Sequence, residues 1–66
     1  MKIKWINRFS REEGYVKYVD YKEKHFVNTW NYSEAKSFKD LATTIKAIDK
    51  LNDYGEGINN EFIPIE

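Results

Sequence analysis

The 66-residue sequence has no cysteine, one proline and three glycines. The absence of cysteine excludes disulfides and thiolate metal sites, so apolar burial alone must offset the conformational entropy of so short a chain. No apolar run approaches the ~20 residues of a membrane-spanning helix. The basic start, Met1-Lys2-Ile3-Lys4, is not followed by the apolar stretch of a signal peptide. We therefore expect one small domain over residues 1–66, in the cytoplasm and without membrane contact.

The chain also lacks the residue patterns of catalytic and cofactor sites. His25 is the only histidine, which rules out a His–His metal site. The paired acidic residues Glu12 and Glu13 lie in an expected solvent-exposed turn, where nothing would shift a carboxyl pKa for acid–base catalysis. The serines are not in a nucleophile elbow, and the glycines do not form a phosphate-binding loop. We expect no catalytic residue, no metal and no cofactor, and hence a protein that is not an enzyme.

Aromatic residues are present in quantity and charge is balanced. Aromatic side chains make up 17% of the chain, and eleven basic residues offset eleven acidic ones. Disordered chains are poor in aromatics and carry high net charge, so this composition indicates a folded domain. Residues 1–32 carry a net charge of +3 and residues 33–66 a net charge of −3. Duplex-binding domains usually have a basic surplus, which makes nucleic acid the second choice of partner rather than the first.

Three segments in the first half have the patterns of strands. Residues 2–9 alternate, with Ile3, Trp5 and Phe9 on one parity, which predicts a half-buried strand. Residues 15–21 are dense in aromatic and β-branched side chains that fall on both parities. Residues 25–30 form the third expected strand. The short links between the three indicate an antiparallel meander.

The second half predicts one amphipathic helix and a terminal strand. Ser37 is the expected N-cap, with Asp40 favouring the helix N-terminus electrostatically. Gly55 and Gly57 are expected to end the helix. Its apolar stripe comprises Phe38, Leu41, Ala42, Ile45, Ile48 and Leu51. Residues 58–66 contain Pro64, which confines a strand to a sheet edge. Residues 32–37 fit an extension of the third strand, a further strand or an early helix start.

The predicted fold class is therefore α+β. We expect an antiparallel three-stranded β-meander, one amphipathic α-helix packed on one face, and a C-terminal edge strand or packed tail, in the order βββαβ. One helix can cover only one face of the sheet, yet apolar residues of the strands fall on both. We therefore predict an exposed aromatic face, with basic side chains nearby, whose binding residues are Tyr15, Lys17, Tyr18, Tyr21, Trp30, Tyr32 and Arg8.

The stretch from Trp30 to Ala42, WNYSEAKSFKDLA, resembles one found in short phage-encoded accessory proteins of low-GC bacteria. In such proteins a Tyr/Trp-rich hairpin runs into an A-x-x-F step, here Ala35 to Phe38, and a helix closes the domain. The resemblance implies a host-takeover or anti-defence role, exerted by binding and blocking a larger bacterial protein.

Two functions follow as hypotheses. The first is a non-catalytic protein-binding module, a phage-encoded inhibitor of a bacterial enzyme or defence complex. The second is a single-stranded nucleic-acid-binding protein that stacks bases on sheet aromatics and contacts phosphates with Lys and Arg. A homodimer that buries the surplus aromatic face on itself is compatible with either.

Overall fold

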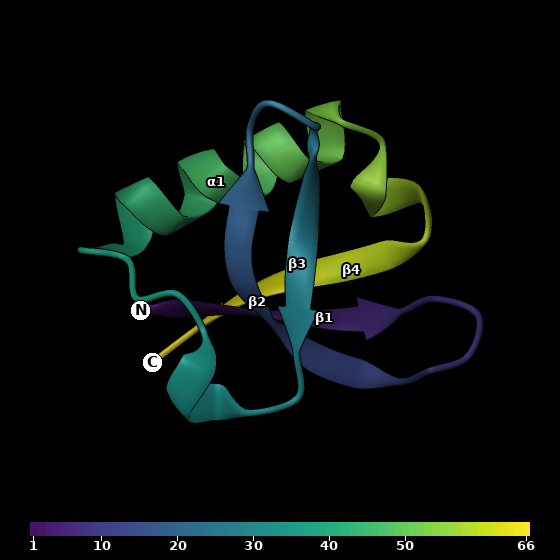
Figure 1. The fold of residues 1–66 in the computed structure, drawn as a ribbon, viewed down its shortest axis with the longest axis horizontal. Helices are drawn as coiled ribbons and strands as arrows, with labels where there is room; N and C mark the ends of the chain where they lie inside the picture. Colours follow the sequence, from purple (N-terminus) through teal and green to yellow (C-terminus); the bar gives the residue numbers. More distant parts are fainter.

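The computed structural model describes residues 1–66 as four strands and one α-helix. In chain order these are β1 (Lys2–Asn7), β2 (Glu13–Asp20), β3 (His25–Thr29), α1 (Leu41–Asp53) and β4 (Asn60–Ile65) (Figure 1). Two 3-10 helices, η1 (Tyr32–Glu34) and η2 (Glu56–Ile58), lie before and after α1. The strands form one antiparallel sheet in the order β3-β2-β1-β4. The α+β class and the antiparallel sheet with one helix are confirmed, and the C-terminal segment is the fourth strand.

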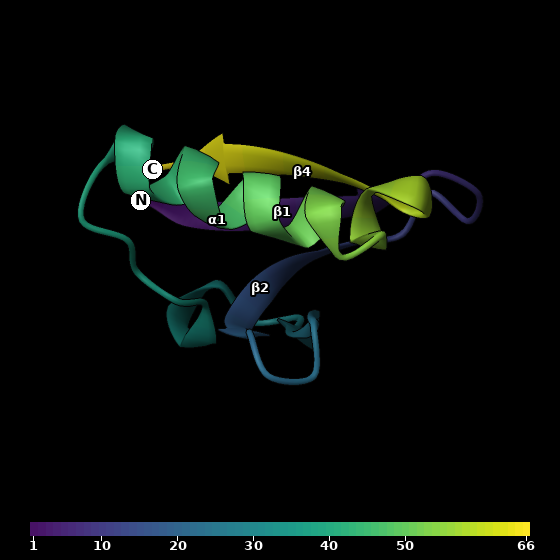
Figure 2. The same ribbon diagram turned by 90° about the horizontal axis from the view of Figure 1, so that it is seen from above.

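The hairpin of β2 and β3 turns away from the other two strands. β1 and β2 pair only from Lys4 opposite Tyr15 to Ile6 opposite Glu13. Between Lys4 and Met1 the two strands separate and leave a fork. The segment that follows η1 lies in this fork. There Phe38 exchanges two backbone hydrogen bonds with Met1, at 2.6 and 2.8 Å. Figure 2 shows β2 leaving the plane of β1 and β4, while α1 runs alongside these two strands.

A β-bulge in β2 decides which side chains face the core. The register passes from Val16 opposite Asn28 to Tyr18 opposite Val27, which leaves Lys17 as the extra residue. Val16 and Val19 therefore both face the core, where both are buried. Tyr15 and Tyr18 share the opposite face, although simple alternation would place them on different faces. Strict alternation, which would set Val19 on the same face as Tyr15, therefore fails beyond Lys17.

The core lies between α1 and the inner face of the curled sheet. Its buried residues are Ile3, Trp5, Val16, Val19, Phe38, Ala47, Ile48 and Leu51. The Trp5 indole is central, and its Nε1–H donates to Asn28 Oδ1 at 2.7 Å. Gly14 lies opposite Trp5, and a Cβ atom there would come within 2.6 Å of the indole. Glycine is thus required at position 14, where the Trp5 ring crosses β2.

The helix begins later than the sequence predicts. Asp40 is the N-cap, and its Oδ1 accepts from the Thr43 N–H at 2.9 Å and from the Thr43 hydroxyl at 2.8 Å. Ser37 as N-cap is wrong, because the backbone of Phe38 is already paired with Met1. At the other end Gly55 has φ of 89°, so the expected glycine stop is confirmed.

The buried stripe of α1 is also rotated from the predicted one. The buried helix residues are Thr44, Ala47, Ile48 and Leu51. Leu41 and Ile45 were expected in the core but are 52% and 40% exposed. Phe38 is buried as expected, yet it enters the core from the extended segment before the helix. There it belongs to the same buried cluster as Ala47, Ile48 and Leu51 of the helix.

The ends of the strands differ from expectation in two further places. β1 ends at Asn7, whose Oδ1 accepts from the backbone N–H groups of Phe9 and Ser10, both at 2.9 Å. Phe9 therefore lies in a turn and is 75% exposed, so its predicted place on the buried face is wrong. Residues 32–37 contain η1 and then run extended into the fork. No helix of the protein is long and apolar enough to cross a membrane.

Candidate functional site

Three tyrosines and three lysines gather on the face of the sheet that α1 does not cover. We define the tyrosine–lysine face as Tyr15, Tyr18, Tyr32, Lys2, Lys17 and Lys36. The bulge places Tyr15 and Tyr18 on this face, and η1 brings Tyr32 beside Tyr15. The rings of Tyr15 and Tyr32 meet edge to face, with centroids 5.5 Å apart. Tyr18 is 47% exposed and Tyr32 is 44% exposed, whereas Tyr15 is half-buried.

Local hydrogen bonds hold η1 and its tyrosine in place. Asn31 caps η1, because its Oδ1 accepts from the Ser33 N–H at 3.1 Å and from the Ser33 hydroxyl at 2.8 Å. The buried Thr29 hydroxyl donates to Glu34 Oε1 at 3.1 Å. The Tyr32 hydroxyl donates to the main-chain oxygen of Glu66. The ring is thus fixed at its backbone and at its hydroxyl.

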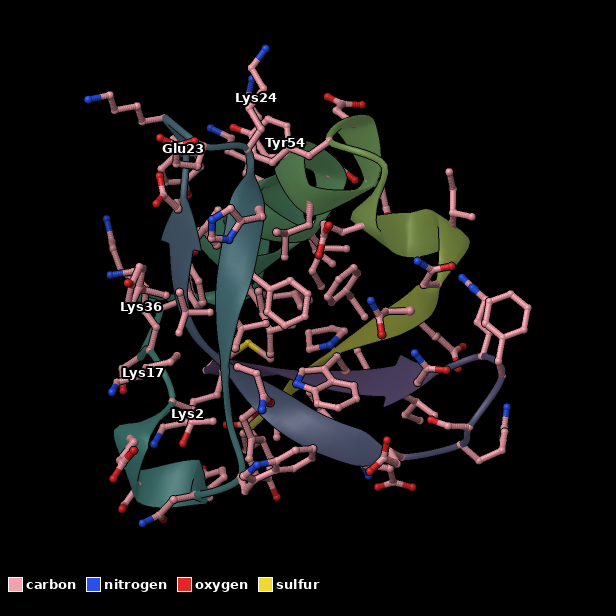
Figure 3. All side chains as sticks on the ribbon, turned by 45° about the vertical axis from the view of Figure 1, so that its right-hand side comes forward. Lys2, Lys17, Glu23, Lys24, Lys36 and Tyr54 are labelled. Atoms are coloured by element: carbon pink, nitrogen blue, oxygen red, sulfur yellow. The ribbon has the colours of Figure 1, made fainter.

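The lysines of the face carry charge that no carboxylate neutralises. Lys2 Nζ donates to the Tyr32 carbonyl at 2.7 Å and lies 4.0 Å from the centre of the Tyr32 ring. Lys17 is the exposed bulge residue, and Lys36 is exposed on the segment that bonds to Val16. Figure 3 shows the three lysines following one another along one side of the molecule. None of them has an ion pair, which makes the face locally positive on a neutral protein.

Lys4 lies next to this face but contributes differently. Its Nζ is 2.7 Å from Glu13 Oε1. The hydrogen bond to this carboxylate, reinforced by its charge, raises the pKa of Lys4 above the ordinary value. Glu13 therefore balances the charge of Lys4, and the free positive charge comes from Lys2, Lys17 and Lys36.

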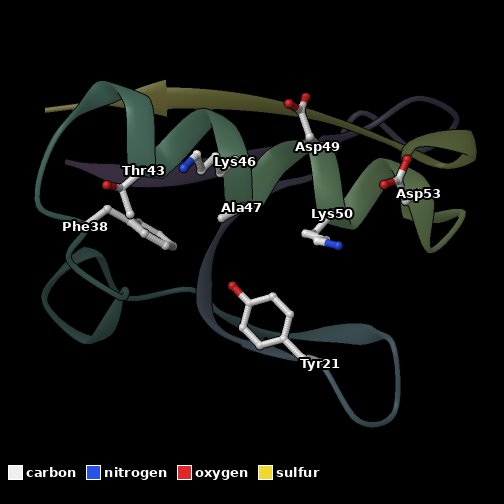
Figure 4. Close-up of a pocket in the computed structure, with 8 residues that line it drawn as sticks. All are labelled: Tyr21, Phe38, Thr43, Lys46, Ala47, Asp49, Lys50 and Asp53. Carbon is white, nitrogen blue, oxygen red and sulfur yellow. The ribbon is translucent and has the colours of Figure 1, made fainter.

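A separate cleft of about 380 Å³ lies between α1 and the end of β2. In Figure 4 the Tyr21 ring points its hydroxyl across the cleft toward the helix. Phe38 and Ala47 supply apolar lining. The charged lining comes from the helix, with two lysines and two aspartates that balance each other: Lys46, Lys50, Asp49 and Asp53. The cleft thus has no net charge that would favour an ionic ligand.

The structure brings together four of the seven sequence-predicted binding residues: Tyr15, Lys17, Tyr18 and Tyr32. Tyr21 is 54% exposed but belongs to the cleft. Trp30 is 65% exposed, its ring lies 5.5 Å from that of the core residue Trp5, and it lines a hollow with Tyr15 at the border of the tyrosine–lysine face. Arg8 lies beyond the opposite end of β1 from Lys2, where its Nε donates to the Gly57 carbonyl at 3.0 Å.

Sequence reasoning did not find Lys2, Lys36 or the exposed pair Phe9 and Ile58. The sequence did contain a signal for Lys2, because its alternation with Ile3 in the first expected strand indicates that Lys2 lies on the face opposite the core. Lys36 had none, since its segment could be assigned to a strand, a turn or a helix. Phe9, in the turn after β1, is 75% exposed, and Ile58, in η2, is 72% exposed. Arg8 donates hydrogen bonds to the Gly57 and Asn59 carbonyls, so both side chains lie near the end of β1 opposite Lys2.

No protein-family model, curated protein or solved structure matches the chain. No group of three or more His, Asp or Glu side chains is arranged to hold a metal ion. The tyrosine–lysine face is therefore the candidate functional site.

Proposed function

We propose that the protein is a non-catalytic protein-binding module that docks its tyrosine–lysine face on an acidic patch of a larger protein. The observation that carries the proposal is the bulge at Lys17, which sets Tyr15 and Tyr18 on one face beside Tyr32 and three unpaired lysines. The partner is a bacterial enzyme or defence complex in the cytoplasm, and binding inhibits it. The bacterial partner and the inhibitory effect are supported by the resemblance of residues 30–42 to phage accessory proteins.

The chemistry of the face suits a protein partner. Tyrosine combines a large contact area with a hydroxyl, and interfaces are enriched in it. Free lysines around such rings complement carboxylates, which speeds association and sets the orientation of the partner. Tyr32 is already fixed by its hydrogen bonds and its contact with Tyr15, so less side-chain freedom is lost on binding. A small rigid face of this kind can bind without a deep pocket.

The test compares truncation of two side chains of similar exposure. Tyr18→Ala removes a 47% exposed ring from the face, and Leu41→Ala removes a 52% exposed side chain from the helix. We expect a protein retained from native-host lysate by the wild type to be retained by Leu41→Ala. The Tyr18→Ala variant should bind that protein roughly tenfold more weakly or worse, as for an interface anchor. Equal retention by both variants would show that the face is not the binding surface.

Single-stranded nucleic acid is the second candidate, because the same rings and lysines could stack bases and contact phosphates. A fluorescently labelled oligothymidine separates the two functions. If nucleic acid is the partner, anisotropy should rise at low salt, fall steeply as salt is added, and decrease for Tyr32→Ala. An unchanged signal at low salt would exclude this function and leave the protein partner.

A further inference from the structure

The outer edge of β3 is an open hydrogen-bonding edge. β3 pairs with β2 on one side, and no backbone group of residues 25–29 bonds to any other segment. One side-chain contact reaches its backbone, from the His25 ring nitrogen Nδ1 to the Phe26 carbonyl at 3.1 Å. Figure 1 shows β2 beside β3 on one side, with β4 crossing behind it. The edge therefore presents free N–H and C=O groups to a further strand.

The two edge strands of the sheet, β3 and β4, differ in how well they are protected against pairing with a further strand. β4 carries Pro64, which lacks a donor, and the charged residue Glu61. β3 has the sequence HFVNT, without proline, lysine or a carboxylate. Natural sheets usually protect exposed edges with such residues, and β3 has none of them. Large exposed rings also flank it, from Tyr18 on the neighbouring strand and Trp30 just after β3.

We propose that β3 pairs with β3 of a second copy of this chain, antiparallel and two-fold symmetric about Val27. This register sets Val27 against Val27 and Phe26 against Asn28. No charged residue lies in the paired stretch, so the symmetric arrangement opposes no like charges, which would destabilise it. Just beyond the stretch it brings Lys24 of one copy opposite Trp30 of the other, a cation beside a ring that is 65% exposed. The β3 edge is therefore complementary to the β3 edge of a second copy.

Pairing through β3 yields a dimer and no larger assembly, and it sets the relative position of the two tyrosine–lysine faces. Each copy uses its β3 edge once, and the other edge is interrupted by Pro64, so the assembly does not extend into a filament. Paired antiparallel strands turn equivalent faces to the same side. Two tyrosine–lysine faces would therefore lie side by side in one eight-stranded sheet. A dimer could then engage a partner with repeated sites through both faces, which raises avidity.

Sedimentation velocity of the wild type over a range of concentrations is the first test. We expect the mass to shift from one to two chains as the concentration rises toward about 1 mM, because a five-residue strand buries little surface. Hydrogen exchange adds a readout that needs no variant, since β3 amides pointing away from β2 should gain protection with concentration. A single chain at the highest concentration, with β3 amides unprotected, would overturn the proposal.

Charge substitutions at the symmetry axis test the register. Val27→Lys and Val27→Glu each place like charges opposite each other, so each variant alone should be monomeric. An equimolar mixture of the two should form a heterodimer, because the same positions then carry opposite charges. Ile63→Lys, a half-buried position on β4, is the control and should dimerise like the wild type. Dimers of Val27→Lys alone, or no dimer in the mixture, would contradict pairing through β3.

Discussion

The Trp5 indole and the Asn28 side chain form a hydrogen bond of 2.7 Å that ties β1 to β3 across β2. Trp5 is 7% exposed but Asn28 is exposed at the surface, so water can partly replace the acceptor once the amide is removed. We predict that Asn28→Ala lowers the free energy of unfolding by about 0.5–1.5 kcal/mol, the range for a typical intramolecular hydrogen bond. Urea unfolding followed by tryptophan fluorescence measures this. Asn59→Ala, an exposed asparagine without a side-chain hydrogen bond, is the control, and equal losses in both variants would refute the prediction.

Two glycine substitutions should differ in effect although each adds one methyl group. At Gly14 the new Cβ would lie 2.6 Å from Trp5 Cζ2, an atom of a buried ring that cannot move aside. At Gly57 it would lie 2.2 Å from Asn52 Oδ1, the end of an exposed side chain that can rotate away. We predict that Gly14→Ala lowers the free energy of unfolding by about 1–3 kcal/mol or more through overpacking. Gly57→Ala should change it far less, and the reverse order in urea unfolding would show that the Trp5 packing is misassigned.

Asp40 should make stability depend on acid pH. The backbone N–H of Thr43, followed by its hydroxyl, stabilises the carboxylate and lowers the pKa of Asp40 below its ordinary value of 3.8. A lowered pKa in the folded protein means that this contribution is present above the ordinary pKa and is lost as pH falls through the lowered one. Asp40→Asn keeps a capping acceptor but cannot titrate. We predict that the wild type has the higher melting temperature at neutral pH and that the difference disappears in acid; a constant difference would contradict this role.

Local sequence patterns that are typical of only one element of secondary structure were predictable from the sequence. The order βββαβ followed from three runs of strand formers, one helical repeat and an apolar end with Pro64 at an edge. Gly55 marked the end of the helix because its φ of 89° is costly for other residues. The surplus of tyrosines also indicated rings outside the core, and four of the five candidate aromatics are at least 44% exposed.

Features that depend on contacts between distant segments were not predictable. The bulge at Lys17 arises where β1 and β2 separate, and no residue type in β2 marks that point. The pairing of Phe38 with Met1 removes Ser37 as a cap, although Ser37 matches a helix N-terminus locally. Leu41 and Ile45 also match the apolar stripe of the helix locally, but the buried residues are Thr44, Ala47, Ile48 and Leu51. Tyr21 was grouped with the other rings, although it lines the separate cleft, because alternation alone cannot show that the sheet curls.

Site-specific photocrosslinking tests most directly whether the tyrosine–lysine face is the surface that meets a partner. Benzoylphenylalanine replaces Tyr18 in one protein and the 72% exposed Ile58 in another, and both are irradiated in native-host lysate. We predict one discrete protein adduct from position 18, weakened when Lys17 and Lys36 are changed to glutamate, and no such adduct from position 58. An adduct formed from position 58 and not from position 18 would place the binding surface at the opposite end of β1 and contradict the account.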